Sequence, residues 1–438
     1  MFETAKKLLV ENVLCDHCIG RQFALLGYGL SNKERGKIIK NALILENFSR
    51  IQSEDHLIIM VKNIAYTDNS LASNSLEKLK ITFEKEKKKC ELCDGLFNDL
   101  DKITEQVLVR ISKEEFQSYL IGAKFLPSLI EKEDILRAKY SITTGETMKE
   151  EFTREIGKRI NIRTKKEPSF NLPDITIIIN LIKNEITLEK RSLYIYGRYQ
   201  KLIRTIPQTK WPCWECNGKG CQKCNFTGKL YQESVEELIA EPFIKNVGGS
   251  GTKFHGAGRE DIDALMLGNG RPFVLEIRNP NKRLVDLKKI QKKVNRKAKG
   301  KVKVSELEIS DKKKIQKLKS LATETKKTYR AKIILDQDIS EEKIAELING
   351  LKGIEIKQKT PQRVIHRRAN LERTRRVYDI SIRKLSDKEI EAEITGGGGL
   401  YIKELISGDN GRTLPSFTSI LGFQAKCVRL DVTRLHYD

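Results

Sequence analysis

The chain has 438 residues, too many for one ordinary hydrophobic core, so its length predicts two or three domains. No run of 18 apolar residues occurs and the first eleven residues lack an apolar signal segment, which argues against a membrane protein or a secreted one. Lysine and arginine number 82 against 59 acidic residues, a net charge of +23, so we expect a soluble cytoplasmic protein that binds nucleic acid, and nothing in the composition requires an obligate protein partner.

Eight of the nine cysteines form four C-x-x-C pairs, and the first two pairs are Cys15/Cys18 and Cys90/Cys93. In a reducing compartment this pattern favours zinc thiolate sites over disulfides. Four thiolates complete the coordination shell of a structural zinc ion, so the two pairs are predicted to meet through tertiary folding and share one ion. The alternative is two unrelated pairs.

From about residue 98 to residue 204 the sequence alternates between helical and strand patterns. A stripe of apolar residues repeats every four positions and predicts a helix; its members are Met148, Phe152, Ile156 and Ile160. Strands are expected at 174–181, 185–189 and 192–197. Lys183 and Asn184 suit a hairpin turn between the first two strands.

The segment 211–228, WPCWECNGKGCQKCNFTG, places the other two pairs side by side. Its cysteines are Cys213, Cys216, Cys221 and Cys224. The compact spacing predicts a second four-cysteine zinc site. A redox dithiol is the rival interpretation, but redox chemistry needs only one C-x-x-C, so the duplication favours zinc.

The stretch 254–278 combines glycines with charges and then becomes an apolar strand. Gly256 and Gly258 loosen a turn that carries Arg259, Glu260 and Asp261, and residues 273–277 read as a strand. Charged groups on a turn beside a strand end are a common way to present an active site. A surface turn with solvated charges is the alternative.

Two basic runs follow. Residues 282–303 carry eleven lysines and arginines with one acid, Asp286, and Leu284, Leu287, Ile290 and Val294 keep helical spacing, which predicts an amphipathic helix with a basic outer face. Residues 352–376 carry nine lysines and arginines against two acids. Either run is compatible with a merely solvated face, but two of them favour contacts with phosphates.

Four phrases in the last segment resemble the motifs of pseudouridine synthases. GRED at 258–261 resembles the G-R-x-D signature, KTYRA at 327–331 the second motif, the stretch 396–422 with YIK the third, and CVRLDV at 427–432 the final strand. Residues 98–204 resemble a tRNA-binding THUMP domain. With GRYQK at 197–201, the chain resembles the archaeal-type THUMP-containing tRNA pseudouridine synthases that modify T-loop positions 54 and 55.

The resemblance implies a reaction that breaks the N1–C1′ bond, turns the uracil and forms C5–C1′. Asp261 is implied as the essential carboxylate, either attacking C1′ or removing the C2′ proton, and the sequence leaves these alternatives open. Lys403 is implied as the cation that keeps this carboxylate ionised, and Arg259 as the group that holds the flipped-out backbone. No organic cofactor is required, because the reaction is redox-neutral.

The same motifs imply the substrate pocket. Tyr329 and Tyr401 would contact uracil, Ile402 and Leu430 would form apolar walls, and half-buried strand positions are the alternative for the tyrosines. In the second basic run, the expected RNA contacts are Arg367 and Arg368. Four glycines precede a strand-like YIKEL and suit close approach of RNA or a flexible turn. Asp263 competes with Asp261 for the motif position.

These inferences predict an α+β protein. Residues 231–438 form a pseudouridine synthase catalytic domain, a mixed and largely antiparallel sheet with helices on one face. Residues 1–205 form a zinc-bearing THUMP-type α/β lobe that binds tRNA, and residues 206–230 a zinc knuckle. The rival functions are another THUMP-type tRNA-modifying enzyme and a non-catalytic zinc-containing RNA-binding protein.

Overall fold

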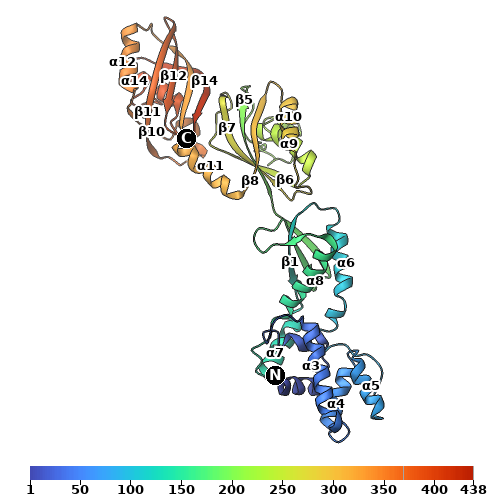
Figure 1. Ribbon diagram of the computed structural model, residues 1–438. Coiled ribbons are helices and arrows are strands. Elements are labelled where there is room, and N and C mark those ends of the chain that lie inside the picture. Colours follow the sequence, from blue (N-terminus) through green and yellow to red (C-terminus); the bar gives the residue numbers. More distant parts are fainter. Residues whose placement is uncertain (368, 438) are drawn as a thin grey trace. The chain divides into compact units, whose positions relative to one another are not determined.

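The structure is a computed structural model that describes residues 1–367 and 369–437. It divides into two compact units, Met1–Arg191 and Ser192–Asp438 (Figure 1). Within the described residues, none of the helices combines the length and the apolar character that crossing a membrane requires.

The first unit joins a helical part to a small α/β part. Its elements are α1 (Phe2–Glu11), α2 (Asp16–Arg21), α3 (Asn32–Asn47), η1 (Phe48–Arg50), α4 (Asp55–Ala65), α5 (Ser70–Lys78), η2 (Leu96–Asn98), α6 (Leu100–Ile111), β1 (Ser118–Lys124), α7 (Pro127–Lys139), α8 (Met148–Thr164), β2 (Glu167–Pro168), β3 (Ile175–Asn180) and β4 (Glu185–Lys190). Helix α8 begins with a capping box between Thr147 and Glu150 and buries the predicted apolar stripe, so this prediction is confirmed.

The sheet of the first unit has the order β2-β1-β3-β4. Strand β1 pairs in parallel with β2 and β3, and β4 pairs antiparallel with β3. The turn between β3 and β4 includes Asn184 with φ +50°, a conformation that asparagine tolerates, as the predicted hairpin requires. The strands expected at 174–181 and 185–189 are therefore confirmed.

The second unit contains the longer sheet. Its elements are β5 (Leu193–Lys201), η3 (Gln222–Cys224), α9 (Val235–Val247), β6 (Gly251–Gly256), β7 (Leu265–Arg278), α10 (Leu287–Lys297), β8 (Val302–Ser310), α11 (Lys312–Glu324), β9 (Lys326–Leu335), α12 (Glu341–Leu351), β10 (Glu355–Lys359), η4 (Gln362–Arg367), β11 (Glu372–Ser386), β12 (Glu389–Gly396), α13 (Ile402–Ser407), β13 (Thr413–Leu414), α14 (Phe417–Leu421) and β14 (Ala425–His436). The strand order is β13-β10-β11-β12-β9-β14-β7-β5-β8, with β6 paired to β7. Only β14 and β7 pair in parallel among these described strands, so the mixed, largely antiparallel sheet is as predicted.

One half of this sheet has helices on both faces. Phe273 and Leu275 of β7 pack in the core that includes α9 and α10, whereas Val274 between them packs with Ile315 and Leu318 of α11. Because both faces are covered, β7 is buried continuously from Gly270 to Leu275 rather than at alternate positions. The expectation of helices on one face is therefore wrong for this half.

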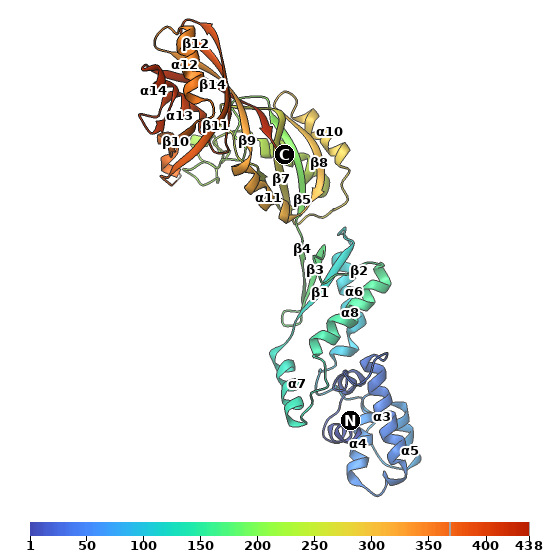
Figure 2. The ribbon, with the colours of Figure 1, turned by 60° about the vertical axis from the view of Figure 1, so that its left-hand side comes forward.

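In the other half, one core joins β9, β11, β12 and β14 to α12, α13 and α14. Figure 2 shows these three helices grouped beside the strands. The strands β9 and β14 carry the second motif and the final strand of the predicted catalytic domain, so the third-motif helix α13 and both strands share this core.

Two boundaries differ from the sequence expectations. The first unit ends at Arg191, because β5 pairs with β7 and β8 of the second unit rather than with the first sheet. The basic helix α10 spans only eleven residues, and Leu284 lies before it with 72% of its surface exposed. Ile290 and Val294 are buried as the amphipathic pattern requires.

Candidate active site and metal centres

A cleft of about 600 Å³ opens in the second unit. It is bounded by the loop after β6, by β7, β9 and β14, and by the start of α13. Seven of the predicted site residues line it: Arg259, Asp261, Tyr329, Tyr401, Ile402, Lys403 and Leu430. The fold thus brings together phrases that are up to 171 positions apart along the chain, between Arg259 and Leu430.

The loop that carries Asp261 depends on glycine. Gly258 has φ +80°, which favours glycine, and a Cβ there would lie 3.1 Å from the Arg271 guanidinium and 3.3 Å from Lys327 Nζ. A Cβ at Gly256 would lie 2.7 Å from Gln208 Nε2. The backbone can therefore pass close to two buried cations and turn Asp261 toward the cleft.

Glu260 holds this loop in place through buried contacts of its side chain. Its side chain is 1% exposed and lies 2.8 Å from Arg271 Nε. Tyr199 donates its hydroxyl to the same carboxylate at 2.9 Å, and Gln208 donates to the Tyr199 oxygen at 2.8 Å. Burial alone would lower the pKa of Arg271, but Glu260 outweighs it and holds the guanidinium charged.

Lys201 holds the same loop through its backbone. Its Nζ donates to the carbonyl oxygens of Ile206, Asp261 and Ile262 at 3.1, 3.0 and 2.9 Å. Burial lowers the pKa of Lys201 to about 8, although Glu260 acts in the opposite direction. This lysine is the last residue of GRYQK, so the phrase fixes the position of Asp261 from a neighbouring strand.

Asp261 faces two cations. Arg363 Nη1 lies 3.1 Å from one carboxylate oxygen and 3.2 Å from the other, and Lys403 Nζ lies 3.5 Å away. Lys403 is closer to Asp263, at 2.7 Å. Burial would raise the pKa of Asp263, but the Lys403 ammonium outweighs it and lowers that pKa. Lys403 thus bridges both carboxylates rather than serving Asp261 alone.

Arg363 is the contact that sequence reasoning missed. It is held by Glu404, whose side chain is 6% exposed and whose Oε1 lies 2.6 Å from Arg363 Nε. Burial would lower the pKa of Arg363, but Glu404 and then Asp261 raise it. The only available signal was its place at the start of RVIHRR, a run whose arginines all suggested phosphate contacts.

The two arginines predicted to contact RNA lie further along this run. Arg367 ends η4, and Arg368 lies outside the described residues.

The residues that were predicted to contact uracil lie on β9, on β14 and at the start of α13. Tyr329 lies on β9, and burial raises its pKa to about 12, so its hydroxyl stays protonated at neutral pH. Tyr401 precedes α13, where Gln358 bonds both its backbone N–H and its carbonyl at 2.9 Å. The strand-like reading of YIKEL is wrong: Leu405 N donates to Tyr401 O, and Gly408 ends a short helix in the left-handed region.

Arg259 is exposed, and its guanidinium group contacts an aromatic ring. Its guanidinium carbon lies 5.1 Å from the ring centroid of Trp211, which also lines the cleft. Trp211 belongs to the knuckle segment 206–230, so that segment borders the cleft. Ile402 and Leu430 are buried, at 3% and 8% exposure, as expected of apolar walls.

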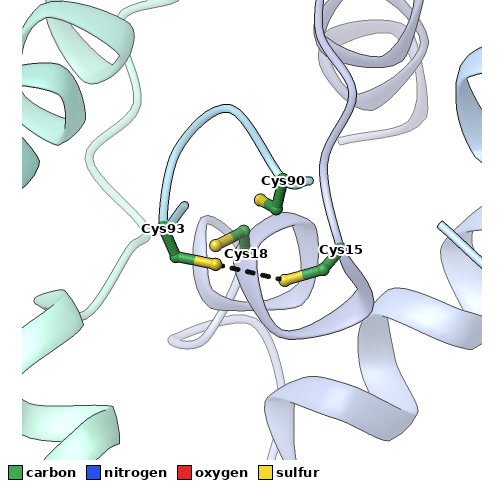
Figure 3. A group of neighbouring side chains, drawn as sticks. All are labelled: Cys15, Cys18, Cys90 and Cys93. Atoms are coloured by element: carbon green, nitrogen blue, oxygen red, sulfur yellow. Dashed lines mark hydrogen bonds between the residues drawn. The ribbon is translucent and has the colours of Figure 1, made fainter. Parts of the chain in front are cut away.

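The eight paired cysteines form two groups. Cys15, Cys18, Cys90 and Cys93 meet in the first unit (Figure 3), and Cys213, Cys216, Cys221 and Cys224 in the second. Four sulfurs at the zinc distance of about 2.3 Å from a tetrahedral centre lie about 3.8 Å apart. The Cys15–Cys93 distance is 3.8 Å, and the distances within the second group include 3.7 Å for Cys221–Cys224 and 3.9 Å for Cys213–Cys221. Both groups therefore fit one tetrahedral ion each.

Family models match both parts of the chain, and they identify it as a THUMP-containing pseudouridine synthase, an isomerase. The model "Pus10, C-terminal" matches residues 194–436, and "Pus10 THUMP domain, archaeal" matches residues 103–180. The chain belongs to the Pus10 family of tRNA pseudouridine synthases.

Relatives support this assignment over the full length. The "tRNA pseudouridine synthase Pus10" of Methanocaldococcus jannaschii is 42% identical over 98% of this chain and 93% of its own length. That of Methanothrix thermoacetophila is 38% identical over 99% of this chain and 94% of its own length. A solved Cbf5-Nop10-Gar1 complex matches 55% of this chain and 58% of the matched one at 17% identity, with a TM-score of 0.29, too low to add to the assignment.

Proposed function

We propose that this enzyme isomerises uridine to pseudouridine in the T-loop of tRNA, at position 54, 55 or both, with Asp261 as the essential carboxylate. The observation that carries the proposal is the position of Asp261 in the cleft, on a loop held by Glu260 and Lys201 and between two cations. Attack on C1′ and removal of the C2′ proton both require an ionised carboxylate, and Arg363 and Lys403 both lie against this one. Arg259 would hold the backbone of the flipped nucleotide.

The remaining side chains of the cleft are suited to binding uracil, which is an uncharged base. Tyr329 and Tyr401 supply a ring or a hydroxyl to uracil, and Ile402 and Leu430 exclude water from it. We propose tRNA as the partner, a cytoplasmic location, and no need for an organic cofactor. Incubating an unmodified tRNA transcript with the purified protein and mapping its pseudouridines tests the proposal; a transcript without any pseudouridine would end it.

We also propose that each four-cysteine group holds one structural zinc ion. All four ligand positions are then thiolates, which leaves no open position for catalysis. Protein purified without chelator should contain zinc in a molar ratio near two, measured by metal analysis. Cys213→Ser and Cys90→Ser should each lower the ratio to near one, because each removes one ligand from a different group.

Cys427→Ser is the matched control for this measurement. Cys427 lies on β14 and belongs to neither group, so the ratio should stay near two. A parent ratio near one would remove one of the two proposed sites, and the two cysteine variants would show which.

The basic helix α10 should contact tRNA phosphates. Among the described residues, none of Lys288, Lys289, Lys292 and Lys293 pairs with a carboxylate, and all four are exposed. Replacing the four with alanine should weaken tRNA binding and flatten the plot of log affinity against log salt by roughly one unit per lost phosphate contact. Binding titrations at several salt concentrations measure this slope.

The control variant removes lysines that lie outside both basic runs. Lys343 pairs with Glu346 at 3.1 Å, and Lys384 pairs with Asp387 at 2.9 Å. Replacing these two with alanine should leave the slope close to that of the parent. If both variants have the parental slope, the charges of α10 form only a solvated face.

A further inference from the structure

The two tryptophans of the chain flank Cys213 in the zinc knuckle. Trp211 lines the catalytic cleft, between Arg259 and an edge-on contact with Tyr231 at 5.7 Å. Trp214 is 65% exposed. An indole ring that stays this exposed offers a large aromatic surface to a partner.

The knuckle holds the backbone of these two residues in one closed loop. Its base is closed by the bridge between Pro212 and Lys229, by Cys213 N donating to Gly228 O at 2.8 Å, and by Leu230 N donating to Trp211 O at 3.0 Å. Three residue steps separate Trp211 from Trp214, so their Cα atoms are at most about 11 Å apart. That reach corresponds to about three nucleotides of a stacked strand at about 3.4 Å each.

The exposed ring of Trp214 is prepared for stacking on one face. Lys223 Nζ lies 3.6 Å from its ring centroid and covers one side. Lys223 also pairs with Glu215 at 3.4 Å, but both side chains are about half exposed, so this pair is weak. The cation therefore stays available to an RNA phosphate while the other face of the indole meets solvent.

A further aromatic residue of the knuckle is exposed and has a strained backbone conformation. Phe226 is 77% exposed and has φ +59°, which is rare for a bulky residue. Strain of this kind persists where the surrounding structure enforces it and is found at functional sites. Segment 206–230 also contains four lysines against one glutamate, which favours an anionic partner.

We propose that the knuckle binds an unpaired nucleobase of the RNA substrate on the ring of Trp214, next to the uridine that enters the cleft. An exposed ring face binds a base only when that base is free of a duplex, and the lysines favour the attached phosphate. A rigid four-thiolate module presents the ring without an ordering cost on binding. The substrate part of this inference rests on the proposed function.

The test uses the full-length protein and intrinsic fluorescence. Trp211→Phe leaves Trp214 as the one tryptophan, so its emission reports on that ring. A hairpin RNA with a T-arm loop should quench this emission on binding, and a blunt duplex of the same composition should not. Trp214→Leu should weaken hairpin binding roughly 5- to 150-fold, the scale of one lost base–aromatic stack, whereas Trp214→Phe should stay near the parent.

Zinc content of each variant shows whether the knuckle is intact. If Trp214→Leu loses its metal, the emission of Trp214 in the Trp211→Phe variant decides the question, because that variant keeps the Trp214 ring. Unchanged Trp214 emission at saturating hairpin, or equal hairpin affinity of the leucine variant and the parent, would overturn the inference, as would equal quenching by the duplex. Binding and emission are read without turnover, so a parent that isomerises no uridine would refute the proposed function and still leave the stacking question decided.

Discussion

Asp261→Asn is expected to abolish pseudouridine formation while tRNA binding stays close to that of the parent. Asparagine keeps the shape of the side chain and removes the charge that either proposed mechanism needs. The loop should keep its position, because Glu260 and Lys201 hold it through groups that the substitution does not touch. Single-turnover assays on an unmodified transcript should show a rate lower by roughly 10⁴-fold or more, the scale of losing one member of a catalytic unit.

Asp263→Asn is the matched control, two positions away on the same loop. Its side chain is 68% exposed and its main partner is Lys403, so the change should reduce activity only in part. Its carbonyl accepts a bond from Arg204 that the substitution leaves intact. If Asp263→Asn were inactive with an unchanged melting temperature while Asp261→Asn remained active, the essential carboxylate would be Asp263.

The motif phrases predicted which residues gather at the cleft but not how they are held. The register of β5 and β7 places Tyr199 opposite Arg271, and this pairing creates the buried network around Glu260. These two residues are 72 positions apart, and no local pattern specifies that register. In the sequence alone, Glu260 is therefore indistinguishable from one more charge of a surface triplet.

Arg363 escaped prediction for a related reason. A run of arginines indicates a basic surface, but it does not show which arginine lines the cleft. Glu404 decides this, because it is nearly buried on α13 and binds the first arginine of the run. The phrase YIKEL, which contains the start of α13, was itself interpreted as strand-like, since its five residues are too few to show a helical period.

Glu260→Gln is expected to destabilise the second unit strongly. The Glu260 and Arg271 side chains are 1% and 2% exposed, so the substitution leaves an arginine charge buried without its carboxylate. Removing one partner of a buried ion pair typically costs about 3–5 kcal/mol. Tyr199 also loses a charged acceptor. Chemical denaturation, followed by a probe within residues 192–438, measures the change in the free energy of unfolding.

Two further variants test whether the loss of stability comes from the unpaired Arg271 charge or from the lost hydrogen bonds of the network. Glu241→Gln removes a carboxylate that is 43% exposed and pairs with Lys245 and Lys297, and since surface pairs contribute about 0–1 kcal/mol each it should change stability much less. The double variant Glu260→Leu/Arg271→Met replaces both charges by apolar side chains and should recover part of the loss, because no charge is then left unpaired. A double variant less stable than Glu260→Gln would mean that the hydrogen bonds of the network, rather than the unpaired Arg271 charge, dominate the cost.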